Sequence, residues 1–155
     1  MVVIVIMIVV GGLAITTIRK ESMSSLIKRT SNDFRSLCSR ARYNAMESGQ
    51  DRMVVYDPEK QMFYMARPTA NAEEDSMYEY GFVIYEKDRW QMPEEFELTT
   101  EDTEPFEVFR FYPDGGASGR WSLNLGCKDN DSGMVIEVAK LTGTVTAREW
   151  GEGEK

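Results

Sequence analysis

The first eighteen residues carry no charged side chain, and this run constrains the chain more than any other feature. Residues 1–10 are apolar without a break, and the next eight remain uncharged. A helix of this length spans about 27 Å, close to the hydrocarbon thickness of about 30 Å in a bilayer. The run therefore predicts a membrane helix. Its apolar side chains are Val2, Val3, Ile4, Val5, Ile6, Met7, Ile8, Val9, Val10 and Leu13.

A cleaved signal peptide and a buried core helix both fit this run less well than a membrane helix does. A signal peptide needs a basic segment before the apolar run and small residues at the cleavage site. No basic residue precedes the run here, and Ala14, Ile15 and Thr16 make a poor cleavage site. A helix buried in a protein core is seldom apolar on every face. We therefore expect residues 1–18 to lie in a membrane or against similar helices.

A second helical pattern follows without an intervening break. From Met23 onward apolar residues recur in steps of three, four and seven, which places them on one face of a helix. No proline interrupts the segment, and Ser48 with Gly49 offers a C-terminal stop. One helix is therefore expected to about Ser48, apolar in residues 1–18 and amphipathic in residues 19–48. The side chains expected to pack on the rest of the chain are Leu26, Ile27, Phe34, Leu37, Ala41 and Ala45.

Beyond Gly49, short runs of alternating residues separated by turn residues predict antiparallel strands. The expected strands cover residues 52–56, 61–67, 80–85, 96–98, 106–112, 120–125, 134–139 and 143–146. Within residues 106–112, simple alternation puts Phe106, Val108 and Arg110 on one face and Glu107, Phe109 and Phe111 on the other. The expected fold class is α+β, a long N-terminal helix packed on a small antiparallel β-sheet or β-sandwich. That β domain covers residues 49–150, and residues 151–155 form a tail.

Charge is distributed unevenly along the chain. The formal net charge is −8, which disfavours nucleic acid as a partner because phosphate binding needs a basic surface. Residues 19–42 nevertheless carry a net +5, whereas residues 69–107 carry a net −11. The two segments are either two solvated faces or complementary surfaces of neighbouring subunits. In the second case Arg35 and Arg42 are the candidate charge contacts.

The residue inventory disfavours catalysis and metal binding. The chain has no histidine, which removes the commonest general base and metal ligand. Cys38 and Cys127 form no CxxC pair, so they are either two separate buried thiols or one disulfide. Residues 129–133 look like part of a calcium loop but lack its later glycine and glutamate, which favours a hairpin turn. We expect no enzyme activity and no cofactor.

Three stretches resemble one known family. Residues 1–14 read MVVIVIMIVVGGLA, and residues 40–45 read RARYNA at the end of the predicted helix. Residues 111–119 read FYPDGGASG, followed by VIEV and then by LTGTV at residues 141–145. This order resembles the type IV pilin superfamily and, within it, the GspH/FimT group of minor pseudopilins. The family's processing motif, glycine followed by Phe-Thr-Leu-Ile-Glu, is not among these residues, so no processing site is assigned.

The resemblance implies a pilin-like subunit that assembles through its N-terminal helix into the periplasmic pseudopilus of type II secretion. It implies a single pass through the bacterial inner membrane, with the β domain in the periplasm. The implied partners are other pilin-like subunits, major and minor, and the inner-membrane secretion platform. Arg19 and Lys20 after the span would by themselves place the domain in the cytoplasm, so this orientation rests on the resemblance. The alternative is a FimT-like minor pilin of a type IV pilus, acting in assembly or DNA uptake.

Overall fold

The computed structural model describes residues 23–69, 81–120, 122–128 and 131–150. Helix α2 (Met23–Ser48) leads into the β domain. It ends at Gly49, whose φ of 65° lies in the left-handed region that favours glycine. The strands that follow are β1 (Arg52–Asp57), β2 (Met62–Pro68), β3 (Phe82–Gln91), β4 (Phe96–Glu97), β5 (Phe106–Phe111), β6 (Ala117–Gly119), β7 (Ser122–Cys127), β8 (Gly133–Val138) and β9 (Val145–Trp150).

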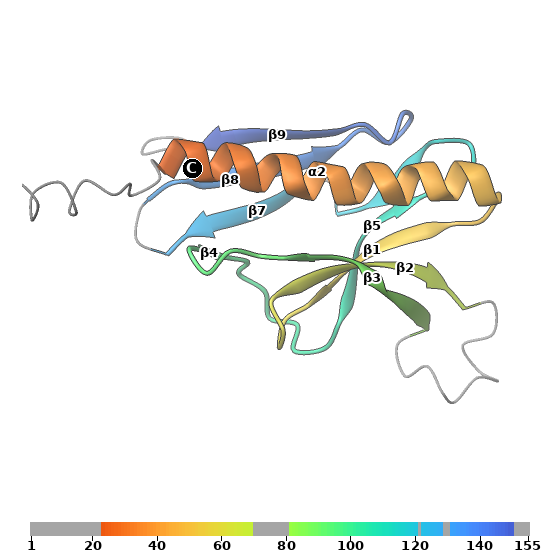
Figure 1. The fold of residues 1–155 in the computed structure, drawn as a ribbon, viewed down its shortest axis with the longest axis horizontal. Helices are drawn as coiled ribbons and strands as arrows, with labels where there is room; N and C mark the ends of the chain where they lie inside the picture. The colour runs from red at the N-terminus through yellow and green to blue at the C-terminus, as the bar shows by residue number, and fades with distance from the viewer. Residues whose placement is uncertain (1–22, 70–80, 121, 129–130, 151–155) are drawn as a thin grey trace, which may run out of the picture.

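These strands form two antiparallel sheets that share one helix (Figure 1). The first, called sheet A, has the order β3-β2-β1-β5-β6, and the second, sheet B, has the order β4-β7-β8-β9. Helix α2 contacts strands of both sheets, most extensively β1 and β9. The structure therefore confirms the expected α+β class, a long helix packed on antiparallel sheets.

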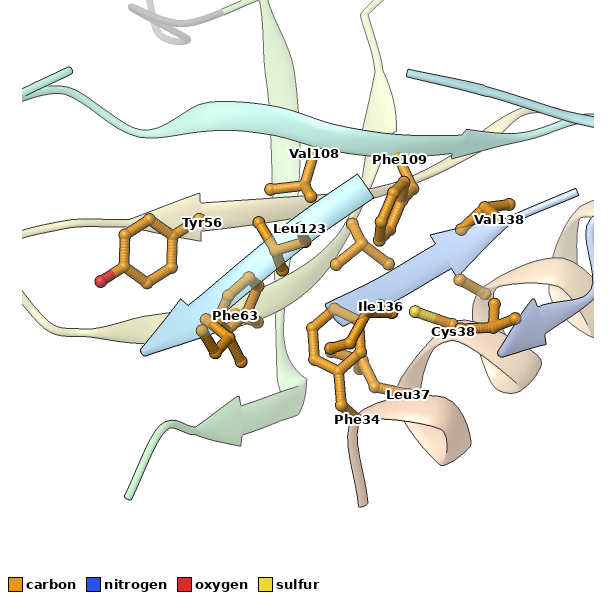
Figure 2. Packing of buried hydrophobic residues seen from close by; sticks show 14 of the residues in the cluster. Phe34, Leu37, Cys38, Tyr56, Phe63, Val108, Phe109, Leu123, Ile136 and Val138 are labelled. Atoms are coloured by element: carbon orange, nitrogen blue, oxygen red, sulfur yellow. The ribbon is translucent and has the colours of Figure 1, made fainter. Parts of the chain in front are cut away.

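The core lies where α2 meets the inner faces of both sheets. Phe34 packs edge-on against Phe63, with ring centroids 4.9 Å apart, and against Trp90 at 5.3 Å. Sheet B supplies mainly aliphatic side chains such as Leu123 and Ile136, and Figure 2 shows them gathered with the helix residues. Each large side chain buried in this way contributes about 1.5–3 kcal/mol. Burial on both sheets thus fixes the helix to the domain.

A bulge in β5 overturns the predicted alternation of residues 106–112. Val54 pairs with Phe109 and Val55 pairs with Glu107, so Val108 has no partner of its own on β1. The extra residue shifts the faces by one position, and Val108, Phe109 and Phe111 all enter the same core. The prediction that separated Val108 from Phe109 and Phe111 is therefore wrong.

Strand β3 carries a larger irregularity at the edge of sheet A. Tyr64 pairs with Arg89 and Met65 pairs with Tyr85, which leaves residues 86–88 outside the register. These three residues are all charged. They explain why the sequence pattern predicted a strand that ends at residue 85, whereas the strand resumes and continues to Gln91.

Two further strands differ from prediction, one at the edge of sheet B and one at the edge of sheet A. Strand β9 pairs with β8 from Val145 to Trp150, whereas the sequence predicted a strand over residues 143–146. Residues 140–144 instead form the turn of the β8–β9 hairpin, since the Gly143 amide donates to the Ala139 carbonyl at 2.7 Å. The three-residue strand β6 was not predicted. It pairs only with β5, so it had no alternation long enough to detect.

Candidate assembly site

The predicted membrane helix lies outside the described residues. This applies to residues 2–10 and to Leu13, so the structure says nothing about them. Within the described ranges, no helix combines the length and the apolar character that a membrane span requires. The candidate site within those ranges is therefore helix α2 and the surfaces beside it.

Most side chains predicted to pack on the domain lie in the core. Ile27, Phe34, Leu37, Ala41 and Ala45 are all buried on one face of α2. Leu26 is half-buried and packs at the margin of the same cluster. The helical periodicity alone located this face, because residues three and four apart share one side of a helix.

Three further helix residues belong to this face. The sequence pattern placed Met23 and Cys38 on the apolar stripe, although they were not named as packing residues, and it missed Thr30. Met23 packs at the margin of the core, and Cys38 is fully buried. Thr30 is 1% exposed, and its hydroxyl oxygen has no hydrogen-bond partner. The spacing from Ile27 to Thr30 to Phe34 would have placed Thr30 in the stripe, but its polar side chain gave no signal of burial.

Cys38 and Cys127 are both free and buried. Of the two alternatives, a disulfide or two separate thiols, the structure therefore shows two separate thiols. Burial raises the pKa of the Cys38 thiol far above its ordinary value of 9.0. Burial also raises the pKa of Cys127, whereas its hydrogen bond with Ser132 lowers it. The Cys127 sulfur lies 3.7 Å from the Met23 sulfur, so it faces the beginning of α2. Both thiols are protonated at neutral pH and act as small apolar side chains.

Arg42 joins the helix to two turns. Its Nε donates to the Gly115 carbonyl at 3.1 Å, and its side chain also lies against Gly143. A Cβ on Gly143 would stand 2.6 Å from the Gly115 oxygen and 3.0 Å from Arg42 Cδ. This junction, defined as Arg42, Gly115 and Gly143, brings the RARYNA stretch together with the FYPDGG and LTGTV segments of the C-terminal stretch.

The glycines of this junction are required by their backbone conformations. Gly115 has a φ of 86° and Gly143 has a φ of 59°, both in the left-handed region. The Gly115 amide donates to the Tyr112 carbonyl at 2.9 Å, and Gly116 donates to the Asp114 side chain at 2.8 Å. The Pro-Asp-Gly-Gly sequence therefore forms the predicted turn and presents its backbone to Arg42.

The two predicted charge contacts occupy different environments. Arg35 is exposed on the outer side of α2. Arg42 is half-buried, and its Nε donates a hydrogen bond to the Gly115 carbonyl of the same chain. Arg40, on the same helix, lies 3.8 Å from Asp88 of β3. The acidic segment also has an internal partner, because Arg120 pairs with Asp102 at 2.8 Å.

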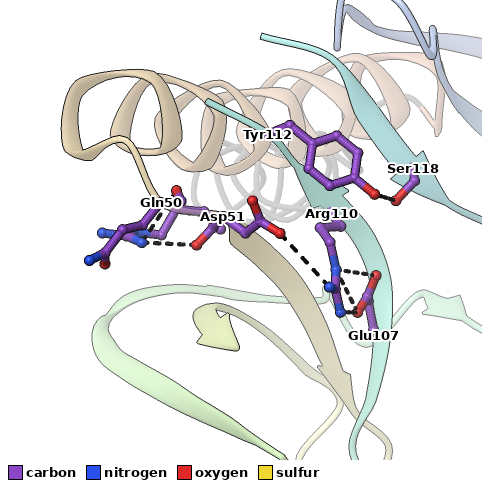
Figure 3. A network of polar contacts seen from close by, with 7 residues as sticks. Gln50, Asp51, Glu107, Arg110, Tyr112 and Ser118 are labelled. Atoms are coloured by element: carbon purple, nitrogen blue, oxygen red, sulfur yellow. Dashed lines mark hydrogen bonds and ion pairs between the residues drawn. The ribbon is translucent and has the colours of Figure 1, made fainter. Parts of the chain in front are cut away.

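A network of polar contacts lies on sheet A near the end of α2 (Figure 3). The bulge at Val108 lets Glu107 and Arg110 meet on one side of β5, where Arg110 Nη2 lies 2.6 Å from Glu107 Oε2. This hydrogen bond raises the pKa of the Arg110 guanidinium. Arg110 also lies 3.9 Å from Asp51, which precedes β1. The network is structural, since it ties the helix-to-strand connection to β5.

The described residues contain no group of three or more carboxylate or cysteine side chains able to hold a metal ion. The described residues on both sides of positions 129–130 belong to a hairpin. Gly126 of β7 pairs with Gly133 of β8, and the Cys127 amide donates to the Ser132 carbonyl at 2.9 Å. This arrangement agrees with the predicted turn.

Comparison with known proteins identifies the fold. No protein-family model and no curated protein matches the sequence. The solved structures that match include two of the minor pseudopilin EpsH from the type II secretion system of Vibrio cholerae. One has a TM-score of 0.54 and 18% identity, over 83% of this chain and 98% of that chain. The other has a TM-score of 0.52 and 19% identity, over 86% of this chain and 99% of that chain. The chain therefore has the fold of this minor pseudopilin.

Proposed function

We propose that this chain is a minor pseudopilin, a structural and non-catalytic subunit of the periplasmic pseudopilus of type II secretion. The observation that carries the proposal is the fold shared with EpsH over nearly the whole of that structure. The contact between two of the three family-like stretches also supports it, because Arg42 of the RARYNA stretch lies against Gly115 and Gly143 of the C-terminal stretch.

In this proposal residues 1–18 cross the bacterial inner membrane once before assembly, and the β domain lies in the periplasm. During assembly the same apolar residues leave the lipid and pack against the helices of neighbouring pilin-like subunits. Exposing residues 2–10 to water instead would cost roughly 10 kcal/mol or more. This penalty couples extraction from the membrane to incorporation into a filament. The secretion platform of the inner membrane is the proposed site of this transfer.

The test is incorporation of a tagged chain into pseudopili, together with secretion, in the bacterium that encodes it. Replacing Ile6 and Val9 with aspartate should prevent recovery of the chain with other pilin-like subunits after cross-linking, because two charges would enter the helix bundle. The matched control replaces the same residues with leucine and should be recovered normally. Deleting the gene should abolish secretion of type II substrates. Recovery with long surface pili and normal secretion would instead assign the chain to a type IV pilus.

A charge contact between subunits remains part of the proposal. The exposed cation Arg35 on α2 would meet an acidic surface of a neighbouring subunit. Arg35→Glu should lower incorporation severalfold without affecting the fold, because its side chain is exposed. Arg42→Glu tests the contact less cleanly, since it also removes the hydrogen bond to Gly115. Unchanged incorporation of Arg35→Glu would exclude this contact.

A further inference from the structure

The outer face of sheet B has an open floor between two walls. Four residues lie in one row across the sheet, since Glu97 pairs with Gly126, Gly126 with Gly133, and Gly133 with Trp150. The two central residues are glycines, so no side chain rises from the middle of the row. Glu97 and Trp150 therefore stand at its two ends, about 14 Å apart at a strand spacing of about 4.8 Å.

The indole ring of Trp150 covers only part of this floor. A Cβ on Gly133 would stand 2.8 Å from two carbons of the ring, so the ring lies directly over this glycine. A Cβ on Gly126 would meet only Glu97 Cγ, at 4.0 Å, so the floor above Gly126 is open. Trp150 is half-buried, so part of its ring faces the solvent beside this opening. A ligand that enters the opening can contact the backbone below it and the indole beside it.

The groove formed in this way, called the sheet B groove, has a volume of about 490 Å³. Small-molecule sites in proteins commonly have volumes of about 300–1,000 Å³. Thr99, Ser122 and Asn124 line the groove with two hydroxyl groups and one carboxamide, and all three side chains are exposed. Leu98 adds a half-buried apolar side chain. The lining therefore combines an aromatic ring with several uncharged hydrogen-bonding groups.

The charged side chains of the lining are largely engaged within the chain. They are the acidic Glu97 and Asp131 and the basic Arg120. Arg120 is bonded to Asp102 at 2.8 Å and lies 4.3 Å from the centroid of the Phe106 ring, so contacts outside the groove fix its position. Asp131 also has an interaction within the chain. Because acids outnumber bases in the lining, a phosphate-bearing ligand is disfavoured.

This combination of groups matches the chemistry of a sugar chain. The C–H groups on one face of a sugar ring are electropositive, and they pack on the electronegative face of an indole. The sugar hydroxyl groups can exchange hydrogen bonds with Thr99, Ser122 and Glu97. An acetamido substituent finds a partner for each of its halves, since Leu98 offers apolar contact to the methyl group and Asn124 offers a carboxamide to the amide.

We propose that the sheet B groove binds an N-acetylated sugar chain, with one ring stacked on Trp150 beside the open floor at Gly126. The proposed function places the β domain in the periplasm, so we assign the ligand to the glycan of the bacterial cell wall. This source of the ligand rests on the proposed function, whereas the groove is a property of the β domain. The site is complete within one chain and requires no second copy.

Calorimetric titration of the full chain with N-acetylchitotetraose, a β-linked tetrasaccharide of N-acetylglucosamine, tests the proposal. The chain is kept in micelles of a detergent without a sugar head group, because such a head group would compete for the groove. The chain should bind this tetrasaccharide. Cellotetraose, which has the same linkage but no acetamido groups, should bind severalfold more weakly, and a thymidine oligonucleotide should not bind. Failure to bind N-acetylchitotetraose, equal affinity for cellotetraose, or tighter binding of the oligonucleotide would each overturn the proposal.

Variants of the floor and the wall locate the ligand in the groove. Gly126→Leu should abolish measurable binding, because its side chain fills the open floor, and circular dichroism should be unchanged because only Glu97 Cγ lies nearby. Trp150→Ala should weaken binding about tenfold through loss of stacking, and Trp150→Phe should weaken it less. Thr146→Ala, exposed on the same face of β9 but outside the groove, is the matched control and should bind normally. Binding that survives Gly126→Leu in a folded chain would overturn the proposal.

Sedimentation with purified cell-wall sacculi tests the assigned source of the ligand. The full chain in the same micelles should sediment with the sacculi, and Gly126→Leu should remain in the supernatant. A chain that binds the tetrasaccharide but does not sediment with sacculi would overturn the assignment to the cell wall. Neither measurement depends on assembly, so a failure to bind sugar would remove this inference and leave the proposed function intact.

Discussion

The two halves of helix α2 attach to the domain in different ways. The first half buries large side chains, with Phe34 surrounded by Phe63, Trp90 and Phe109. The second half buries Leu37 and Cys38 near the middle of the helix and, beyond them, only the small residues Ala41 and Ala45. It is joined to the turns through Arg42. The first half therefore supplies the apolar burial that stabilises the helix on the domain. The end of the second half depends on the close approach of Arg42 to the backbones of Gly115 and Gly143. A single added methyl group there is expected to lower the stability.

The largest expected effect concerns the first half. Phe34→Ala should lower the free energy of unfolding by about 3–5 kcal/mol, because it leaves a cavity among three aromatic rings. Urea unfolding followed by near-ultraviolet circular dichroism would measure the change. The matched variant Arg35→Ala, at an exposed neighbouring position, should change it by less than about 0.5 kcal/mol. Similar losses for both variants would refute the contrast between the halves.

The second half is tested at the junction beside Arg42. Gly143→Ala should cost about 1–3 kcal/mol, since it adds a methyl group 2.6 Å from the Gly115 oxygen at a positive φ. Gly49→Ala provides the control, because Gly49 has a similar φ of 65° but nothing within 4 Å. Its smaller cost would isolate the backbone strain, and the difference between the two variants would measure the close approach. Equal costs would show that packing at the junction adds nothing.

The stability of the domain should also depend on pH through the Cys38 thiol, which is buried near the middle of α2. Burial raises the pKa of Cys38 above the 9.0 of the unfolded chain, so the folded protein holds this proton more tightly. The stability from this group is complete below pH 9 and is lost as the pH rises above it. Unfolding free energy should fall by about 1 kcal/mol from pH 9 to pH 10.

Cys38→Ala is the control for that titration. Its unfolding free energy should decline less over the same interval, although the raised pKa of Tyr56 will still contribute near pH 10. Identical slopes for the two proteins would mean that Cys38 is reached by water in the folded state.

The smallest expected effect lies on the buried face of the first half. Thr30→Val should raise the free energy of unfolding by about 0.5–1 kcal/mol, because it replaces a buried hydroxyl without a hydrogen-bond partner by a methyl group of the same shape. Thermal unfolding would detect this as a higher midpoint. A loss of stability would indicate that the hydroxyl has a partner in solution.

Much of this architecture was predictable from local patterns. Helical spacing identified Ile27, Phe34 and Leu37 as core residues because a single face of α2 meets the domain. Proline, aspartate and glycine at residues 113–116 identified the turn because few residues adopt the required backbone conformation. Both signals depend on residues close together in the sequence.

The remainder depends on contacts between distant segments. The bulge at Val108 follows from how β5 pairs with β1, and no property of residues 106–112 alone indicates it. The role of Arg42 depends on two turns more than seventy residues away. The row from Glu97 to Trp150 exists only after four strands have paired. Sequence periodicity cannot report such placements because it describes one element at a time.

The charged residues 86–88 outside the register of β3 have a consequence for how copies of this chain meet. An edge strand with free amide and carbonyl groups can recruit another strand and begin uncontrolled aggregation. Three consecutive charged side chains that interrupt the ladder make such an addition unfavourable along this edge of sheet A. Copies of this chain are thereby protected from indiscriminate edge-to-edge strand pairing, which leaves association to surfaces with specific shapes.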